Sequence, residues 1–381
     1  MHVMHVIDSL HGGGAELSLL EVVPGLASRG VRTSIVTLLA DDGGLEDRLS
    51  ALGVRRTRLR HRDPVGQTLE LRNVIRAERP DLLHTTLLFA NLTGRMAART
   101  VRTPVVTTLA NRDYGPEHRA DSRHGAWGVR AVHGAEAITA PLTTRFHAVS
   151  EDVARVMSRR LRIPDDRIQV VYRGRDPARL GIPTLDRRLR VRAALSVDAG
   201  APLVLSVGRL DRQKGVETTI VAFRHLLTRM PDAVLLVVGR PGNALDVVQS
   251  MARETPAVRL LGHRTDVPDL MCAADVLSFP SRWEGLPGTV LEAMALRLGI
   301  VASDIAPVTE AIGDVDWPLV RPDDTQALAE GLTSALRGGA VNEARKDAGE
   351  RRFRTLFTAE AASEGMARLY QGVLCDTRLR L

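Results

Sequence analysis

The sequence predicts an α/β protein of two domains, each built on a mostly parallel sheet wrapped by helices. Short apolar runs alternate with longer stretches of helical periodicity, which is the pattern of parallel strands joined by covering helices. Glycine-bearing loops follow several of the apolar runs. The chain has 381 residues, 44% hydrophobic and 25% charged, which is enough for two cores and too apolar for a disordered chain.

The first domain is expected over residues 1–175. It begins with the apolar run Val3–Ile7, the glycines Gly12–Gly14 and a helical pattern from Ala15 to Leu26, which predict a strand, a glycine loop and a helix. Further strands are predicted at Thr33–Leu38, Leu82–Thr86, Val105–Leu109, Ala137–Ala140 and Phe146–Val149. A charged stretch with glycine and proline at Val170–Pro177 predicts the linker.

The second domain, residues 176–357, repeats the alternation of strands and helices. Its predicted strands are Leu203–Val207, Val234–Val238, Val258–Leu261, Asp275–Phe279 and Ile300–Ser303. Ligands of open α/β sheets bind beyond the carboxyl ends of strands, so chemistry is expected in the loops that follow them. A last amphipathic helix at Thr358–Tyr370, within about 358–381, can pack back on the first domain or on the second.

Charge is distributed unevenly along the chain. Residues 1–175 hold 26 Arg against 19 acidic residues, a net of +7, whereas the remainder holds 26 basic and 26 acidic residues, a net of zero. An acidic partner or an anionic membrane surface is one interpretation of this excess, and a scattered, solvated surface is the other. Aromatic residues make up only 3% of the chain, which argues against a base-stacking surface and against nucleic acid as a partner.

Cysteine usage and hydropathy indicate where the protein works. Cys272 and Cys375 have no metal-ligand spacing, and two free thiols are expected. No run of about 18 uncharged apolar residues and no signal-peptide order is found, which predicts a cytoplasmic protein.

The sharpest feature is Pro280–Met294, where a predicted strand leads through a glycine-bearing loop into a helix. Glu284 and Glu292 stand eight positions apart in it. A helix that begins near Gly288 offers free N–H groups and a dipole to a phosphate. Glu292, about one turn in, then accepts hydrogen bonds from a ribose diol or only complements the dipole, and Glu284 addresses a second polyol.

A second feature is the loop Ser206–Gly215, which also follows a predicted strand. Arg209 and Lys214 lie five positions apart beside Gly208 and Gly215, and combine a planar fork with a point charge, which suits a diphosphate. Two solvated cations are the alternative. The position holds one of only two lysines in the chain, which favours the diphosphate.

Taken as a whole, Pro280–Met294 resembles the E-x7-E signature of retaining GT-B glycosyltransferases, particularly family 4. The loop at Gly208 resembles the G-R-x4-K-G element of the same family. The resemblance implies a GT-B fold, two Rossmann-like domains facing each other across a cleft. It places the acceptor side on the first domain and the nucleotide-sugar donor on the second.

The resemblance also implies roles for individual residues. Glu284 faces the donor sugar, and Arg209 and Lys214 neutralise the donor diphosphate, whose charge grows as the glycosidic bond breaks. These three are the expected catalytic residues, Glu292 holds the ribose, and no metal or other cofactor is expected. The other donor-binding candidates, with His263 as a pocket wall near the nucleobase, are Gly13, Gly14, Gly208, His263, Arg264, Thr265, Leu286, Pro287, Gly288 and Thr289.

The glycine loop and the acceptor side are less specific. A tight turn alone explains Gly12–Gly14, and Leu17 stands where a dinucleotide fingerprint needs its third glycine, so bound NAD is disfavoured. The segment Leu82–Arg95 resembles the acceptor-side strand and loop of the family. It makes His84 and Asn91 candidates, with a buried structural histidine as the alternative for His84.

Two positions depart from the family pattern. Relatives place a histidine before an asparagine after the strand Val105–Leu109, whereas here Ala110 precedes Asn111. The histidine's role therefore does not transfer. Either Asn111 or Arg112, the acceptor-side candidates, replaces it as a polar contact, or the enzyme binds a different sugar. Arg173 stands where an asparagine is usual.

The predicted function is a retaining, metal-independent glycosyltransferase. It moves a hexosyl or N-acetylhexosaminyl group from a nucleotide sugar, UDP-linked first and GDP-linked next, to a hydroxyl of a glycan, lipid-linked or natural-product acceptor. Peripheral contact with an anionic membrane, at its cytoplasmic face, fits the basic first domain. A nucleotide-sugar epimerase and a non-catalytic nucleotide-sugar-binding protein of the same fold are the alternatives.

Overall fold

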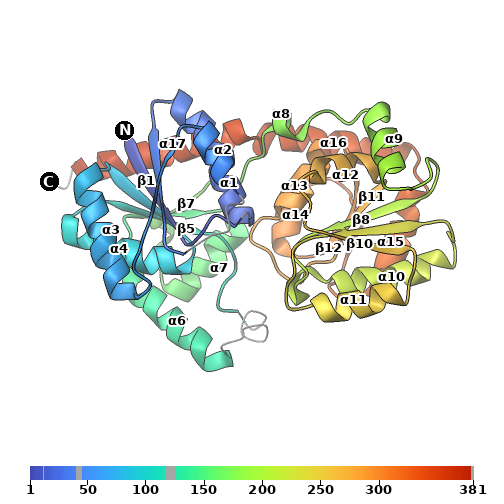
Figure 1. Ribbon diagram of the computed structural model, residues 1–381, viewed down its shortest axis with the longest axis horizontal. Helices are drawn as coiled ribbons and strands as arrows, with labels where there is room; N and C mark the ends of the chain where they lie inside the picture. The colour runs from blue at the N-terminus through green and yellow to red at the C-terminus, as the bar shows by residue number, and fades with distance from the viewer. Residues whose placement is uncertain (12, 40–44, 116–124, 379–381) are drawn as a thin grey trace. The chain divides into compact units, whose positions relative to one another are not determined.

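The chain divides into two compact units in the computed structural model, which describes residues 1–11, 13–39, 45–115 and 125–378. Unit 1 comprises Met1–Arg175 and Leu356–Leu381, and unit 2 comprises Asp176–Thr355 (Figure 1). Each unit contains one parallel sheet with helices packed against it. The α/β fold predicted from the sequence is therefore confirmed.

Unit 1 is built on a seven-stranded parallel sheet with the strand order β3-β2-β1-β4-β5-β6-β7. Its strands are β1 (His2–Ile7), β2 (Arg32–Thr37), β3 (Arg55–Arg58), β4 (Leu82–Thr86), β5 (Val105–Leu109), β6 (Arg145–Ala148) and β7 (Ile168–Val170). β1 is an interior strand, third in this order, and is buried along its whole length. A strand covered on both faces needs a continuous apolar run, which is why the sequence predicts it.

The helices of unit 1 cover its sheet, and some of them begin at side-chain caps. They are α1 (Gly14–Ser28), α2 (Glu46–Ala51), α3 (Pro64–Glu78), α4 (Leu88–Val101), α6 (Gly125–Thr139), α7 (Glu151–Leu161) and α17 (Ala359–Arg378), with short 3-10 turns at Ala140–Leu142 and Asp165–Arg167. Asp63 accepts a hydrogen bond from the Gly66 amide at 2.7 Å, and Ser150 accepts one from the Val153 amide at 3.2 Å. Each cap satisfies an amide that the first helical turn leaves unpaired.

The strand predicted at Ala137–Ala140 is wrong. Residues up to Thr139 form the end of α6, and Ala140 begins the 3-10 turn that follows it. Alanine is the best helix former, and the Thr139 hydroxyl donates to the Ala135 carbonyl one turn back at 3.0 Å. A short apolar run of this kind does not distinguish the end of a helix from a strand.

Helix α17 completes the core of unit 1, although it lies far from the rest of the unit in sequence. Met366, Leu369 and Tyr370 are buried against Val22 and Leu26 of α1. A main-chain bond from the Arg175 amide to the Phe357 carbonyl, 2.8 Å long, joins the returning chain to the end of the first segment. This is where the amphipathic C-terminal helix finds its apolar partner.

Unit 2 contains a six-stranded parallel sheet with the order β10-β9-β8-β11-β12-β13. Its strands are β8 (Leu203–Val207), β9 (Val234–Val238), β10 (Val258–Gly262), β11 (Val276–Phe279), β12 (Gly299–Ser303) and β13 (Leu319–Val320). Its helices are α8 (Pro177–Leu180), α9 (Leu185–Ala194), α10 (Val216–Leu227), α11 (Leu245–Arg253), α12 (Val267–Ala273), α13 (Gly288–Ala295), α14 (Ala306–Ile312), α15 (Thr325–Leu336) and α16 (Ala340–Leu356), with a 3-10 turn at Arg212–Lys214.

Strand order places the loops that matter. In each sheet the order reverses beside the first strand of the unit, between β1 and β4 in unit 1 and between β8 and β11 in unit 2. Connections leave the sheet in opposite directions at such a switch point, and ligands bind in the crevice beyond it. The two loops singled out in the second domain, after β8 and after β11, therefore flank one crevice.

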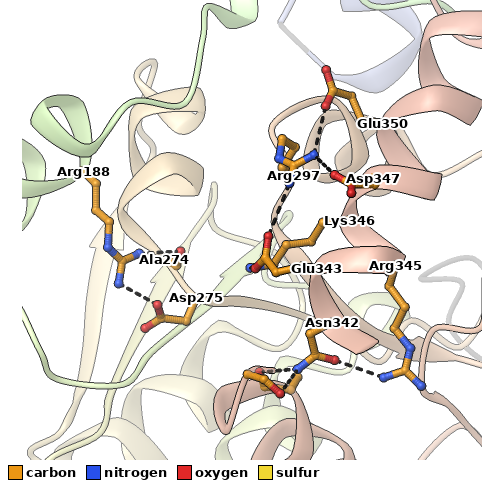
Figure 2. Close-up of polar contacts among 12 residues, drawn as sticks. Arg188, Ala274, Asp275, Arg297, Asn342, Glu343, Arg345, Lys346, Asp347 and Glu350 are labelled. Carbon is orange, nitrogen blue, oxygen red and sulfur yellow. Dashed lines mark hydrogen bonds and ion pairs between the residues drawn. The ribbon is translucent and has the colours of Figure 1, made fainter. Parts of the chain in front are cut away.

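A cluster of charged side chains attaches α16 to the segment that leads into β12 (Figure 2). Arg297 precedes β12 and has a left-handed backbone with φ of 56°. Its guanidinium pairs with Asp347, with Glu343 at 3.3 Å and with Glu350 at 3.4 Å, so one cation holds three carboxylates on successive turns of α16. The side-chain contacts compensate for a backbone conformation that glycine would adopt more readily.

None of the helices described is both long enough and apolar enough to span a bilayer.

Candidate functional site

The β8 loop of unit 2 lies directly against the β11 loop. The Arg282 amide donates to the Gln213 carbonyl at 2.8 Å, and the Gln213 side chain donates to the Trp283 carbonyl at 2.7 Å. Gly215 has φ of 62°, and a Cβ there would lie 2.5 Å from the Pro280 carbonyl oxygen. Only glycine fits both the conformation and the space, so the close approach of the two loops depends on it.

Lys214 and Glu284 meet where these loops join. The Lys214 ammonium lies 2.5 Å from a carboxylate oxygen of Glu284, and the two side chains are 23% and 8% exposed. The ammonium also lies 5.6 Å from the centre of the Phe279 ring. A buried carboxylate needs such a partner, and a partly exposed ammonium keeps further donors for a ligand anion.

Arg282 fastens the β11 loop to three other segments. Its guanidinium donates to Glu217 of α10 at 2.7 Å, to Asp323 after β13 at 2.6 Å and to the Arg212 carbonyl. Thr218 donates to the same Asp323 at 3.1 Å. The hydrogen bond from Arg282 lowers the pKa of Asp323, which keeps this pair charged. Arg282 therefore fixes the backbone that carries Glu284.

Helix α13 begins at the far end of the same loop. Its N-cap is Pro287, which provides no side-chain cap, so the first amides of the helix are left for a ligand or water. Glu292 lies one turn into the helix, is 14% exposed, and has an oxygen 4.0 Å from a guanidinium nitrogen of Arg179 in α8. Gly288 and Thr289 are half-buried at the helix start, whereas Leu286 is buried and packs below it.

The β8 and β9 loops are also in contact. A Cβ on Gly239 would lie 1.7 Å from the Gly208 carbonyl oxygen, so the backbones of the two loops are in direct contact. Arg209 follows Gly208, is 63% exposed and pairs with Asp211. Asp211 also accepts a hydrogen bond from the Asn243 amide at 3.0 Å. Arg209 is thus exposed, and the loop that carries it is held in place by backbone contacts with the β9 loop.

Three predicted donor-binding residues, His263, Arg264 and Thr265, follow β10 at the same edge of the sheet, two strands from β8. His263 and Thr265 are exposed. Burial and the neighbouring Arg240 lower the pKa of His263, whose ring nitrogen lies 3.4 Å from that guanidinium. Arg264 forms a two-point ion pair with Asp266 at 2.8 and 2.5 Å. Within the described parts of unit 2, none of these three residues forms a hydrogen bond or ion pair with Lys214 or Glu284.

In unit 1, Gly13 and Gly14 form the start of α1, while Gly12 lies outside the described residues. A Cβ on Gly13 would lie 2.6 Å from a carboxylate oxygen of Glu16. A Cβ on Gly14 would lie 3.4 Å from the guanidinium of Arg173, which donates to the Ala110 carbonyl at 3.0 Å. The two positions that depart from the family pattern, 110 and 173, are therefore in contact.

His84 lies in a chain of hydrogen bonds whose direction can be deduced. The Val171 carbonyl only accepts, so His147 donates to it from Nε2 at 3.0 Å. Burial lowers the pKa of His147 to about 4, so its ring is neutral and its Nδ1 accepts from the Thr108 hydroxyl at 3.1 Å. Thr108 then accepts from His84 Nε2, and His84 Nδ1 accepts from the Tyr370 hydroxyl, both at 2.7 Å.

The remaining acceptor-side candidates also have structural partners. Asn91 is buried and donates to Glu136 at 3.1 Å, and Glu136 forms an ion pair with the fully buried Arg95 at 3.2 Å. Asn111 accepts a bond from the following amide at 2.9 Å, and the Arg112 guanidinium lies 3.3 Å from Asp152 of α7. Of these candidates, only the half-buried loop of Asn111 and Arg112 lies beyond a strand end with part of its surface open.

Sequence reasoning missed three residues that hold loops in place, two of them in unit 2 and one in unit 1. Arg282 stands inside the recognised segment, but nothing in its spacing reveals its partners. Asp323 follows β13, a two-residue strand too short to predict. Asp8 follows β1 and accepts a bond from the Ala90 amide at the start of α4, and burial raises its pKa to about 6. An acidic residue directly after a buried strand is the signal that could have identified Asp8.

Comparison with known proteins decides the family. Residues 12–179 match the family described as Glycosyltransferase Family 4, and residues 201–337 match Glycosyl transferases group 1. The chain is 30% identical over 313 residues to D-inositol 3-phosphate glycosyltransferase of Xylanimonas cellulosilytica, which covers 76% of this chain and 71% of the relative. The chain belongs to glycosyltransferase family 4.

This family 4 glycosyltransferase is also similar to another relative and, in its fold, to a solved structure. It is 26% identical over 243 residues to UDP-Gal:alpha-D-GlcNAc-diphosphoundecaprenol alpha-1,3-galactosyltransferase of Escherichia coli, covering 62% of this chain and 61% of the relative. The crystal structure of Anabaena HepE in complex with UDP and glucose superposes with a TM-score of 0.85 at 19% identity, covering 98% of this chain and 100% of HepE. The predicted family and the predicted GT-B fold of two Rossmann-like halves are confirmed.

Proposed function

We propose that the protein is a retaining glycosyltransferase that moves a hexosyl or N-acetylhexosaminyl group from a UDP-sugar to an acceptor hydroxyl. The observation that carries the proposal is the paired Lys214 and Glu284 at the switch point of unit 2, beside a helix start without a side-chain cap. Cations and free amides suit a diphosphate, and carboxylates suit sugar hydroxyls. Unit 2 is therefore the donor-binding domain in this proposal, and unit 1 is the acceptor side.

Each residue has a distinct role in the proposed site. Lys214 and Arg209 bind the diphosphate oxygens, with the amides of Gly288 and Thr289 at the start of α13. Glu292, which is 14% exposed, accepts hydrogen bonds from the ribose. Glu284 orients the donor sugar and keeps the Lys214 ammonium in place at 2.5 Å.

The reaction follows from where charge develops. The acceptor oxygen bonds to the anomeric carbon on the face that the leaving group departs from, while the bond from that carbon to the diphosphate oxygen breaks. The acceptor proton passes to the leaving diphosphate, which takes both electrons of the broken bond. Lys214 and Arg209 stabilise this negative charge more in the transition state than in the ground state, so neither a metal ion nor a covalent enzyme intermediate is required.

The comparisons support a uridine nucleotide and leave several acceptor classes open. The name of one relative includes UDP-Gal and a diphosphoundecaprenol acceptor, and the HepE structure contains UDP and glucose. UDP-hexoses and UDP-N-acetylhexosamines are therefore the first donors to test, and GDP-sugars the next. The proposed acceptor is a hydroxyl of a lipid-linked molecule, a glycan or a natural product. The enzyme is proposed to act at the cytoplasmic face of the membrane.

A donor panel tests the proposal. The full chain is screened by thermal shift with UDP-glucose, UDP-galactose, UDP-N-acetylglucosamine and GDP-mannose, and then for release of nucleoside diphosphate with and without EDTA. Binding of one donor class, turnover in EDTA and a product with the donor's anomeric configuration are expected. Inversion of configuration would contradict the retaining assignment, and epimerised donor without transfer would contradict the transferase.

A further inference from the structure

The arginine excess of unit 1 is concentrated in a short stretch of sequence. Residues 52–79 contain eight Arg and three acidic residues, a net of +5 out of the +7 of the whole chain. The stretch forms β3, which is the edge strand of the sheet, the loop after it and α3. We call the outward side of this stretch the β3–α3 surface, defined by Arg58, Arg60, Arg62, Val65, Leu69, Arg72 and Arg76.

The acidic residues of this stretch are already engaged. Glu78 pairs with Arg55 at 3.4 Å, Glu70 with His61 at 2.9 Å, and Asp63 caps α3. Of the surface arginines, Arg58, Arg60, Arg62 and Arg76 are exposed and Arg72 is half-buried. Among the described residues, no carboxylate lies within ion-pair distance of these five guanidinium groups.

Helix α3 adds an apolar component to the same surface. Val65 and Leu69 are 70% and 47% exposed, one turn apart. Arg72 and Arg76 continue the line at i+7 and i+11, whereas the buried residues of α3, Gln67, Leu71 and Ile75, lie on another side of the helix. The exposed line of α3 is thus apolar in its first half and basic in its second.

We propose that the β3–α3 surface docks the protein on a lipid bilayer that contains anionic lipids. Four to eight clustered basic residues beside exposed apolar side chains are the combination that acidic membranes attract. The arginines meet the headgroups while Val65 and Leu69 reach below them. The use of such docking rests on the proposed function, since it would bring a transferase to lipid-linked acceptors.

A nucleic acid would also be attracted by this charge, but the apolar residues favour the membrane. Val65 and Leu69 have no role against a phosphate backbone. Residues 52–79 contain no Phe, Trp or Tyr on which an unpaired base could stack. Tighter binding of duplex DNA or single-stranded RNA than of vesicles would overturn the proposal.

Vesicle co-sedimentation of the full chain tests it, with phosphatidylcholine vesicles and with vesicles of 70% phosphatidylcholine and 30% phosphatidylglycerol. The test variant combines Arg62→Ser, Arg72→Ser and Arg76→Ser, because these side chains make no hydrogen bond or ion pair in the described structure. The control combines Arg229→Ser, Arg253→Ser and Arg337→Ser, three exposed arginines of unit 2, so both variants lose the same charge.

The wild type is expected to bind the anionic vesicles and not the neutral ones. Its affinity should fall between 0.05 and 0.5 M salt, because added salt shortens the distance over which charges interact. Each surface arginine contributes roughly a factor of five, so the test variant should bind about 100-fold more weakly and the control within about threefold of wild type. Equal losses in both variants would overturn the proposal, because net charge rather than this surface would then be responsible.

Two further measurements complete the test. Val65→Ser with Leu69→Ser should weaken the binding that survives at high salt, whereas no change would remove the apolar part of the proposal. Donor hydrolysis in solution should be the same in the test variant and the wild type. Vesicle binding without any donor turnover would contradict the proposed function and support the docking surface. Donor turnover without vesicle binding would support the proposed function and contradict the docking surface.

Discussion

At the scale of single residues, the Lys214–Glu284 pair would set how much positive charge a diphosphate meets in the proposed donor site. The ammonium lies on a mostly buried carboxylate, so its position is fixed before the ligand arrives. Preorganised charge of this kind stabilises a leaving group without rearrangement during the reaction. The chain contains one other lysine, Lys346 on α16, which pairs with Glu343 at 2.9 Å and provides a matched control.

Lys214→Ala should lower kcat for donor turnover by about 100- to 1,000-fold, the usual effect of losing one group that stabilises developing negative charge. It should also weaken UDP binding and lower the melting temperature, because Glu284 is left without its cation. Lys346→Ala removes the ion pair of the other lysine, whose partner Glu343 keeps Arg297, and should leave turnover within about twofold. Steady-state kinetics and UDP calorimetry measure both. Similar kinetics for the two variants would exclude Lys214 from the site.

We expect Arg282 to act by holding the β8 and β11 loops and not by contacting the substrate. Arg282→Met breaks its bonds to Glu217 and Asp323 and leaves both carboxylates without this cation, so kcat should fall by about 10- to 100-fold. Arg282→Lys keeps the charge but cannot reach both carboxylates and the Arg212 carbonyl together, and should recover only part of the activity. Turnover measured with saturating donor checks this order. An Arg282→Met enzyme as active as wild type would contradict a positioning role.

At the scale of elements, the central strands were predictable and the edges were not. β1, β8 and β9 are mostly apolar and almost entirely buried, which leaves little ambiguity. β3 consists of Arg55–Arg58, an Arg-Arg-Thr-Arg run that pairs with β2, so no apolar pattern marks it. β13 has only two residues, too few to show the alternation or the apolar run that predicts a strand.

The candidate site divides in the same way. The β8 and β11 loops could be paired from sequence, because strand ends at a switch point are neighbours. The partners of Arg282 could not, since Asp323 is reached only through the unpredicted β13. The hydrogen bonds of His84 depend on Tyr370, 286 positions away, which no local pattern connects to it.

Glycines test the contact between the loops. Gly215→Ala places a Cβ 2.5 Å from the Pro280 carbonyl at a left-handed φ, so the β8 and β11 loops must separate. A loss of about 1 to 3 kcal/mol in the free energy of unfolding and a marked fall in donor turnover are expected. Gly200→Ala, where a Cβ meets no atom within 4 Å, should change neither. Urea titrations and turnover assays compare the two, and equal behaviour would contradict the role of Gly215.

At the scale of the whole molecule, the buried histidines of unit 1 make its stability depend on pH. Burial lowers the pKa of His5 to about 3 and of His147 to about 4, and holds that of His84 well below its usual value. The unfolded chain binds these three protons near pH 6.5, so their contribution to stability is complete above that pH and is lost as pH falls. Asp8 opposes this, because burial raises its pKa to about 6 and the folded state then binds the extra proton.

The free energy of unfolding should therefore fall by roughly 2 to 4 kcal/mol for each pH unit between about 6 and 4.5. Urea denaturation at pH 7.5, 6.0, 5.3 and 4.6 measures the slope. His5→Phe removes one titrating group and should flatten the slope by about 1.4 kcal/mol per pH unit. A stability that stays constant from pH 7.5 to 4.6 would show that these rings are not held neutral in the folded state.

The placement of α17 in the core of unit 1 has a consequence for synthesis. Unit 1 starts at the first residue, yet Met366, Leu369 and Tyr370 belong to its core. At about 5 to 20 residues per second, the ribosome needs roughly 10 to 40 s to go from Arg175 to Tyr370. During that interval the apolar face of α1 has no permanent cover, while every strand of unit 2 is completed. The order of translation therefore lets the second unit mature first and leaves the first in need of protection until its last helix is made.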